Sequence, residues 1–176
     1  MTHWFALRVK SRFEKAVALA ARKKGFEELL PLYLSDHQRS DRSKSVELPL
    51  FPGYVFCRLD AEQRVPLLTI PGVLHLVGFG KIPAPIDEAE IAVIQNATRS
   101  GLRVKSWPFV EAGQRIRLGS GPLQGIEGFL IQDQEQRRLA VNLPVLRRAI
   151  AVEIEHEWIE SAGVSGSASA TDHRVI

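Results

Sequence analysis

Leu50-Phe51-Pro52-Gly53-Tyr54-Val55-Phe56 is an apolar, aromatic run that is interrupted by a turn signal. Pro-Gly pairs normally lie at solvent-facing chain reversals, whereas Phe and Tyr are normally buried. Pro52 fixes its own φ and Gly53 tolerates positive φ, so Phe51 and Tyr54 are presented from a stiff kink. Two interpretations stay open: the aromatic rings fill a core at the start of a strand, or they form a preorganised platform that a partner covers.

The elements expected around this run alternate between strand and helix. Hydrophobic periodicity predicts strands at 4–9, 29–34, 54–56 and 73–77, helices at 12–24, 61–69 and 87–98, and a polar loop at 35–45. Gly25 is placed to end the first helix, and Asp87 is placed to cap the last one. This order predicts an α+β domain over residues 1–100, with helices packed on an antiparallel sheet.

The spacing of the hydrophobic residues changes after Ser100. Residues 101–109 are a candidate linker, and residues 110–160 show the period-two alternation of short strands. A unit of this size has little core, so we expect a small closed β-barrel that leaves no sheet edge exposed. Residues 161–176 are rich in Ser, Ala and Gly and are predicted to be a disordered tail.

Composition excludes several classes of protein. The chain has 176 residues, of which 45% are hydrophobic and 24% charged, as in an ordinary globular protein. No apolar run is long enough to span a membrane or to act as a signal peptide, which predicts a cytoplasmic protein. Cys57 is the only cysteine and is expected to be a buried, inert thiol. A net charge of +3 permits contact with nucleic acid without requiring it.

Basic residues gather in two places. On a helical wheel, four of them fall within a sector of about 100°, and a fifth lies just before the helix. The first group is Lys10, Arg12, Lys15, Arg22 and Lys23, and the second, in the polar loop, is Arg39, Arg42 and Lys44. Each group is either an ordinary solvated surface or a surface that faces the phosphates of a nucleic acid.

Catalysis has little support in the sequence. The five histidines are scattered without the spacing of metal ligands, and no serine has the setting of a nucleophile. The glycine-rich segment 119–128 matches neither the Rossmann nor the Walker pattern and lies between predicted strands, which favours a tight loop. We therefore expect a protein that is not an enzyme and has no cofactor and no metal site.

Several motifs together resemble the NusG family of transcription elongation factors, over residues 3 to 160. They are Trp4, Lys10, the 50–56 run, Pro71-Gly72-Val73, Pro83-Ala84-Pro85-Ile86, and Gly113-Gln114-Arg115-Ile116 through Gly121-Pro122-Leu123 to Gly128. The resemblance implies an α+β NGN domain joined by a linker to a KOW-type β-barrel. It also implies a monomer with no membrane contact that acts in transcription elongation and antitermination.

The resemblance implies sites for two partners on the NGN domain. The clamp helices of the largest RNA polymerase subunit would be bound by an exposed aromatic patch made of Trp4, Phe51, Pro52, Tyr54 and Phe56. The non-template DNA strand would be bound by Lys10, Arg12, Lys15, Arg22 and Lys23, and the upstream fork by the loop with Arg39, Arg42 and Lys44. Binding of this kind would suppress pausing or termination.

A third site, on the barrel, would recruit a second partner through Leu123, Ile126, Val145 and Leu146. Ribosomal protein S10 is the candidate, whereas Leu123 and Arg147 depart from the family pattern for Rho. The alternation over 149–154 favours a barrel over a helical refolding of this domain. Glu47-Leu48-Pro49 is more similar to the specialised, operon-restricted paralogues of the RfaH and UpxY type than to housekeeping members.

A ribosomal-type RNA-binding protein is the alternative, because KOW barrels also occur there. The two hypotheses differ in the residues on which binding depends. A polymerase-binding factor should depend on Phe51 and Tyr54, whereas an RNA-binding protein should depend on Lys10, Arg22 and Lys23.

Overall fold

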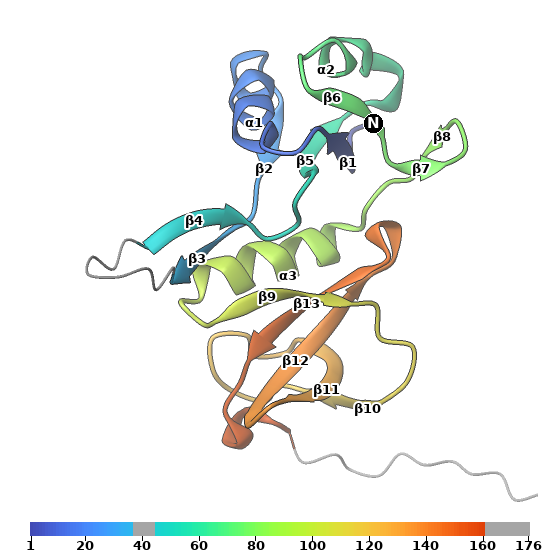
Figure 1. Cartoon of the computed structure of the whole chain (residues 1–176). Coiled ribbons are helices and arrows are strands. Elements are labelled where there is room, and N and C mark those ends of the chain that lie inside the picture. Colours follow the sequence, from blue (N-terminus) through green and yellow to red (C-terminus); the bar gives the residue numbers. More distant parts are fainter. Residues whose placement is uncertain (37–44, 161–176) are drawn as a thin grey trace, which may run out of the picture.

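An antiparallel sheet of four strands organises the N-terminal half of the computed structural model, which describes residues 1–36 and 45–160 (Figure 1). The strand order is β2-β5-β1-β6. The bounds are β1 His3–Val9, β2 Glu27–Leu29, β5 Tyr54–Leu59 and β6 Val73–Leu76. The 50–56 run thus leads into β5, one of the two central strands, and the strand expected at 54–56 is confirmed.

Both faces of this sheet are covered. Successive side chains of a strand point to opposite faces, and β1 is apolar at nearly every position. Phe5 and Leu7 share a core with α1 (Glu14–Lys23) and α2 (Val65–Leu68), whereas Trp4 and Ala6 share another with α3 (Glu88–Arg99). The sheet is therefore the middle layer between two sets of helices.

The predicted helix at 87–98 is confirmed. Asp87 and Glu90 form a reciprocal capping box at its start, and Ile91, Ile94 and Ala97 are buried at helical spacing. Gly25 has a φ of +88° just after the first helix, as expected for its end.

Other predicted bounds need correction. The first helix begins at Glu14 rather than at 12, because Arg12 has a φ of +69° and turns the chain between β1 and α1. The strand expected at 29–34 is divided between β2 and β3 (Leu32–Asp36), which forms a hairpin with β4 (Ser45–Pro49). The helix expected at 61–69 is a short 3-10 turn, η1 (Ala61–Gln63), followed by α2.

A second small hairpin joins β7 (Gly78–Phe79) to β8 (Ile82–Pro83).

The C-terminal half is a five-stranded antiparallel sheet of order β10-β11-β12-β13-β9. Its elements are β9 Val104–Pro108, β10 Gln114–Arg117, β11 Glu127–Asp133, β12 Gln136–Leu143, the 3-10 turn η2 Pro144–Leu146, β13 Arg148–Glu153 and the 3-10 turn η3 His156–Trp158. A bridge between Leu118 and Ile159 covers the outer side of β10. The alternation over 149–154 thus lies in a strand of a barrel-like sheet, as predicted.

The predicted linker over 101–109 is wrong in extent. Residues Val104–Pro108 form β9 and pair with β13, so only a few residues connect α3 to the second sheet. An edge strand of this kind acquires its structure from its partner strand, whose paired residues lie 40 to 48 positions further along the chain, and short-range patterns do not reveal it. The predicted tail at 161–176 lies outside the described residues.

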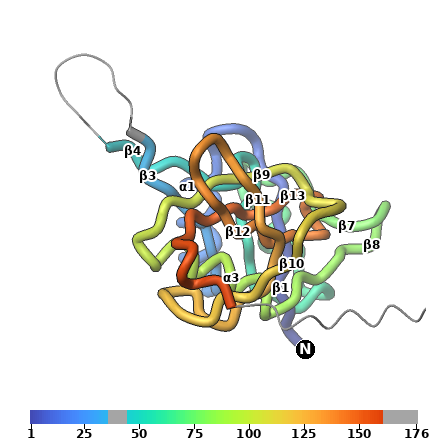
Figure 2. Tube along the Cα trace, turned by 90° about the horizontal axis from the view of Figure 1, so that it is seen from below, coloured from blue at the N-terminus to red at the C-terminus, as the bar shows by residue number. Residues whose placement is uncertain are grey.

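The two halves pack against each other through α3. Figure 1 shows this helix between the first sheet and the strands β9 and β13. In Figure 2, where the molecule is seen from below, the second sheet lies across the helix. One continuous hydrophobic cluster contains buried residues from β1, β5, α3, β12 and β13. None of the helices in the described parts of the chain is long and apolar enough to cross a membrane.

Candidate functional site

The turn at residues 51–54 has the geometry that its sequence demands. The Tyr54 N–H donates to the Phe51 carbonyl oxygen at 3.2 Å, and Gly53 has a φ of +86°. Pro at the second turn position and a positive φ at the third are typical of a type II turn. A Cβ at Gly53 would lie 2.3 Å from Nη1 of Arg8, so any other residue would be strained by the positive φ and would also displace the Arg8 guanidinium.

Side chains from β1 and α1 hold this turn in place. The Gly53 N–H donates to Oε1 of Glu14 at 2.9 Å, and the Gly53 carbonyl oxygen accepts from the Val9 N–H at 2.9 Å. The Arg8 guanidinium carbon lies 4.8 Å from the centre of the Tyr54 ring, a cation–π contact. The turn that carries the aromatic residues is thus held by hydrogen bonds to α1 and β1.

The residues of the predicted aromatic patch differ widely in exposure. Trp4 and Phe51 are each 2% exposed and Phe56 is fully buried, whereas Tyr54 is half-buried and Pro52 is exposed. Phe51 and Phe56 pack edge to face, and Trp4 forms an antiparallel bridge with Ile86. The expectation of an exposed patch is therefore wrong for this arrangement of the chain.

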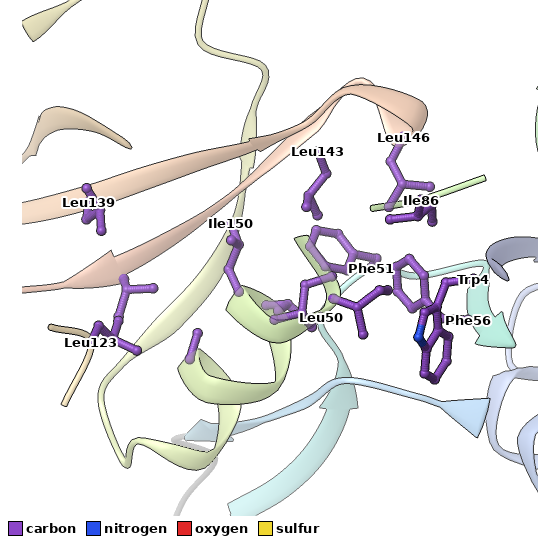
Figure 3. Close-up of a cluster of buried hydrophobic side chains, with 14 of the residues drawn as sticks. Trp4, Leu50, Phe51, Phe56, Ile86, Leu123, Leu139, Leu143, Leu146 and Ile150 are labelled. Atoms are coloured by element: carbon purple, nitrogen blue, oxygen red, sulfur yellow. The ribbon is translucent and has the colours of Figure 1, made fainter. Parts of the chain in front are cut away.

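The second sheet covers the patch. Leu143, Leu146 and Ile150 belong to the same hydrophobic cluster as Phe51 and Ile86. Figure 3 shows these leucines and the isoleucine, from β12, η2 and β13, pointing toward the side of the cluster that holds Leu50, Phe51 and Ile86. Nothing in the local sequence around Phe51 could have revealed this contact, because its other half lies about 90 residues later.

The contact between the two halves is apolar. Within the described ranges, no hydrogen bond and no ion pair joins residues 1–99 to residues 104–160. The ion pairs lie inside each half, for example Arg58 with Glu88 and Lys105 with Asp133. The halves are held together by buried hydrophobic surface, which has no strict directional requirement.

The residues predicted to bind the second partner belong to the hydrophobic cluster that holds the patch, or pack against it. Leu123 and Leu146 are buried in the shared cluster, and Ile126 and Val145 are partly buried against it. Figure 3 shows Leu146 beside Ile86, whereas Leu123 lies at the end of the cluster away from Phe51. The structure thus brings Leu146 of the predicted barrel site to the aromatic patch, although the two sites were predicted for different partners.

The predicted basic surface is divided by the structure. Lys15 donates through Nζ to the Glu47 carbonyl oxygen at 3.2 Å, and Arg22 is paired with Glu28. Both side chains line a groove between α1 and the β2–β3 segment. Lys10, Arg12 and Lys23 are exposed and make no ion pair within the described part of the chain. Arg39, Arg42 and Lys44 lie outside the described residues.

The cysteine is placed as expected. Cys57 is fully buried in β5, and burial, with a smaller effect from Glu28, raises its thiol pKa to about 12. Such a thiol is protonated and unreactive at neutral pH. In the described residues, no group of three or more potential metal ligands comes together.

Sequence reasoning missed three residues that build the site. Glu14 is not among the predicted site residues, yet it is 4% exposed and anchors the turn. Ile150 was predicted only as part of the alternation over 149–154, and Leu143 was not singled out, yet both belong to the cluster that buries Phe51. The one signal for Glu14 is an acidic residue at the start of an otherwise basic helix, where the helix dipole favours a carboxylate.

Comparison with known proteins agrees with this fold and identifies the family. The family described as "NusG: Transcription termination factor nusG" matches residues 2–95, which is more than half of the chain. The transcription termination/antitermination protein NusG of Helicobacter pylori (strain 26695) is 27% identical over 91% of this chain and 98% of its own length. The protein of the same name from Escherichia coli (strain K12) is 27% identical over 90% of this chain and 96% of its own.

A solved structure described as "Domain interaction in Thermotoga maritima NusG" has the same fold, with a TM-score of 0.55. It is 20% identical and covers 91% of this chain and 97% of its own. An α+β domain followed by a small β-rich domain, with the sequence match above, defines a class of transcription factor. The chain belongs to the NusG family of transcription termination and antitermination factors. The expectation that it is not an enzyme agrees with that membership.

Proposed function

We propose that the chain binds RNA polymerase through the 51–54 turn, with the clamp helices of the largest subunit as the target, and so suppresses pausing or termination. The observation that carries the proposal is the anchored turn, which presents Phe51 and Tyr54 from a backbone fixed by Glu14 and Val9. A rigid aromatic anchor binds with little loss of conformational entropy. Membership in the NusG family supports the target class.

We further propose that the arrangement described above is a closed state, in which the barrel occupies the polymerase site. Phe51 is 2% exposed in it, so a partner gains access only when Leu143, Leu146 and Ile150 move away. The absence of polar bonds across the described contact supports reversible separation, because no hydrogen bond or ion pair has to be broken. The partner then competes with the barrel for one apolar surface.

The same separation would release the barrel for its own partner. Leu123, Ile126, Val145 and Leu146 are covered or half-covered in the closed state. Ribosomal protein S10 is the proposed partner, and it would bind only a barrel that has left the NGN domain. Polymerase binding and recruitment of the second partner would therefore be coupled.

For the non-template DNA strand we propose a smaller contact than the sequence suggested. Lys10, Arg12 and Lys23 are exposed, whereas Lys15 and Arg22 are engaged within the protein. Three phosphate contacts to a single strand correspond to a slope of log K against log salt of about −2.

A titration against a clamp-helix fragment tests the proposal. The full chain and its Leu146→Glu variant, called the open variant, are compared, because a carboxylate in place of Leu146 disfavours closure. We expect the open variant to bind more tightly than the native chain, and Phe51→Ala in the open variant to abolish binding. Failure of both the native chain and the open variant to bind would contradict the proposal, and RNA binding that depends on Lys10 and Lys23 would then favour the ribosomal-type alternative.

A further inference from the structure

Glu14 is an acidic residue in the buried core, where acidic residues are rare. It lies in the first turn of α1, is 4% exposed, and is the one charged residue in the buried core among the side chains that the structure describes. Burying a carboxylate is costly unless hydrogen bonds satisfy it. An apolar residue would fill the same position at lower cost to folding, so the carboxylate calls for a specific explanation.

The partner of Glu14 supplies that explanation. In a turn with Pro52 second and Gly53 third, the N–H of the third residue has no acceptor within the turn itself. Gly53 is buried, so its N–H cannot donate a hydrogen bond to bulk water. Oε1 of Glu14 accepts this N–H at 2.9 Å, from 39 residues earlier in the chain.

The opposite side of Gly53 is fixed as well. Its carbonyl oxygen accepts from the Val9 N–H at 2.9 Å, so both polar groups of Gly53 are bound to elements outside the turn. A change in the orientation of the Pro52–Gly53 peptide would break the bond to Glu14 and redirect Phe51 relative to Tyr54. The bond from Glu14 thus selects one orientation of the two aromatic residues.

Glu14 is itself held in place by the chain around it. The positive φ of Arg12 turns the backbone from β1 into α1, and the Phe13 N–H donates to the Lys10 carbonyl oxygen at 3.0 Å. Phe13 packs so closely on Gly72 that a Cβ there would lie 2.4 Å from its ring. The start of α1 is therefore fixed, and the carboxylate with it.

From this geometry we infer that Glu14 is a positioning residue for the proposed polymerase-binding surface: it holds the Phe51–Tyr54 turn in the conformation that the partner recognises. The inference rests on the proposed function, since it takes this turn as the binding element. Glu14 is buried and acts through Gly53, without touching the partner. It is a residue that neither the aromatic patch nor the basic surface includes.

Two substitutions of similar size separate the hydrogen bond from simple packing. Glu14→Met keeps the length of the side chain and removes both the charge and the acceptor, so it leaves no cavity and no buried charge. Glu14→Gln removes the charge and keeps an acceptor oxygen for the Gly53 N–H. Glu27→Ala, which removes an exposed carboxylate from β2, is the control.

The measurements are made on the open variant of the full chain. Hydrogen exchange of the Gly53 amide, followed by NMR, reports on the turn, and titration with the clamp-helix fragment reports on binding. For Glu14→Met we expect the Gly53 amide to exchange faster and the affinity to fall about tenfold, because one buried donor is left unsatisfied. The core amides of Leu7 and Val55 should stay protected, Glu14→Gln should restore most of the affinity, and Glu27→Ala should have none of these effects.

Unchanged affinity in a folded Glu14→Met variant would overturn the inference. So would a Glu14→Gln variant that loses as much affinity as Glu14→Met, because the acceptor oxygen would then be irrelevant. Failure of the proposed function is recognised separately, since the open variant with native Glu14 would already fail to bind the fragment. In that case the inference falls with the function, whatever the Gly53 amide does.

Discussion

The ring of Phe51 meets the ring of Phe56 edge to face, with centroids 6.2 Å apart and planes at 81°. Phe56 belongs to the central strand β5, so this contact ties the turn to the middle of the first sheet. On its other side Phe51 is covered by residues of the second sheet. One aromatic ring thus links the core of the N-terminal domain, the proposed partner site and the contact between the two halves.

The closed state should be insensitive to salt. In the described ranges its two halves share apolar contacts without an ion pair, and moderate salt screens charges while leaving such contacts in place. We expect the distance between fluorescent labels on the exposed residues Lys23 and Gln132 to be the same in low and in physiological salt. The open variant, measured in parallel, should show a broader distance distribution, and a native chain that opens as salt rises would contradict the apolar character of the contact.

Gly53→Ala should weaken both folding and binding more than a matched glycine substitution. Gly53 and Gly25 have φ values of +86° and +88°, so alanine costs about 1 kcal/mol of backbone strain at either position. At Gly25 nothing lies within 4 Å of the added Cβ, whereas at Gly53 the Cβ displaces Arg8 from Tyr54.

Chemical denaturation of the two variants isolates the extra cost. We expect Gly53→Ala to lose about 0.5–1 kcal/mol more than Gly25→Ala, the size of an exposed cation–π contact. Equal losses in the free energy of unfolding would show that Arg8 does not depend on the shape of the turn.

Nucleic-acid binding should depend on the exposed basic residues and hardly on the engaged ones. Combined Lys10→Ala, Arg12→Ala and Lys23→Ala substitutions should reduce the salt slope of single-stranded DNA binding by about 2. Arg22→Ala should leave that slope nearly unchanged, because Arg22 is already paired with Glu28. Fluorescence anisotropy at several salt concentrations measures both, and a larger effect from Arg22 than from the triple substitution would contradict the division of the basic surface.

Cys57 should not react with a thiol reagent while the protein is folded. Burial raises its pKa from the ordinary 9.0 of an exposed thiol to about 12, so the folded protein retains the proton over a range in which the unfolded chain loses it. The contribution of this thiol to stability is therefore present below about pH 9 and is lost as the pH rises toward the folded pKa. Reaction kinetics at pH 8 with and without denaturant, together with unfolding curves of the native chain and Cys57→Ala from pH 8 to 10, test this. Rapid labelling of the folded chain would contradict it.

Much of the first domain could be predicted because its signals are local. Ile91, Ile94 and Ala97 repeat at helical spacing, and the conformation of Gly25 follows from its place after a helix. The strand that contains Val55 also follows from its own apolar run.

What could not be predicted depends on contacts between distant parts of the chain. Trp107 lies in a strand that pairs with β13, and Phe51 is buried in a cluster that includes Leu143 and Ile150. The role of Glu14 depends on a hydrogen bond to a turn 39 residues away. The aromatic run was recognised as the decisive feature, and of its two interpretations the structure bears out the core, which includes residues from the other half of the chain. That a partner also covers these rings stays a proposal.

The most direct test of the account follows the methyl groups of Leu143, Leu146 and Ile150 by NMR while the full native chain is titrated with the clamp-helix fragment. The account predicts that the fragment binds, that Phe51→Ala prevents binding, and that these methyl signals move away from their closed-state positions as the barrel leaves Phe51. Saturating amounts of the fragment that leave all three signals in place would contradict the claim that partner and barrel share one surface.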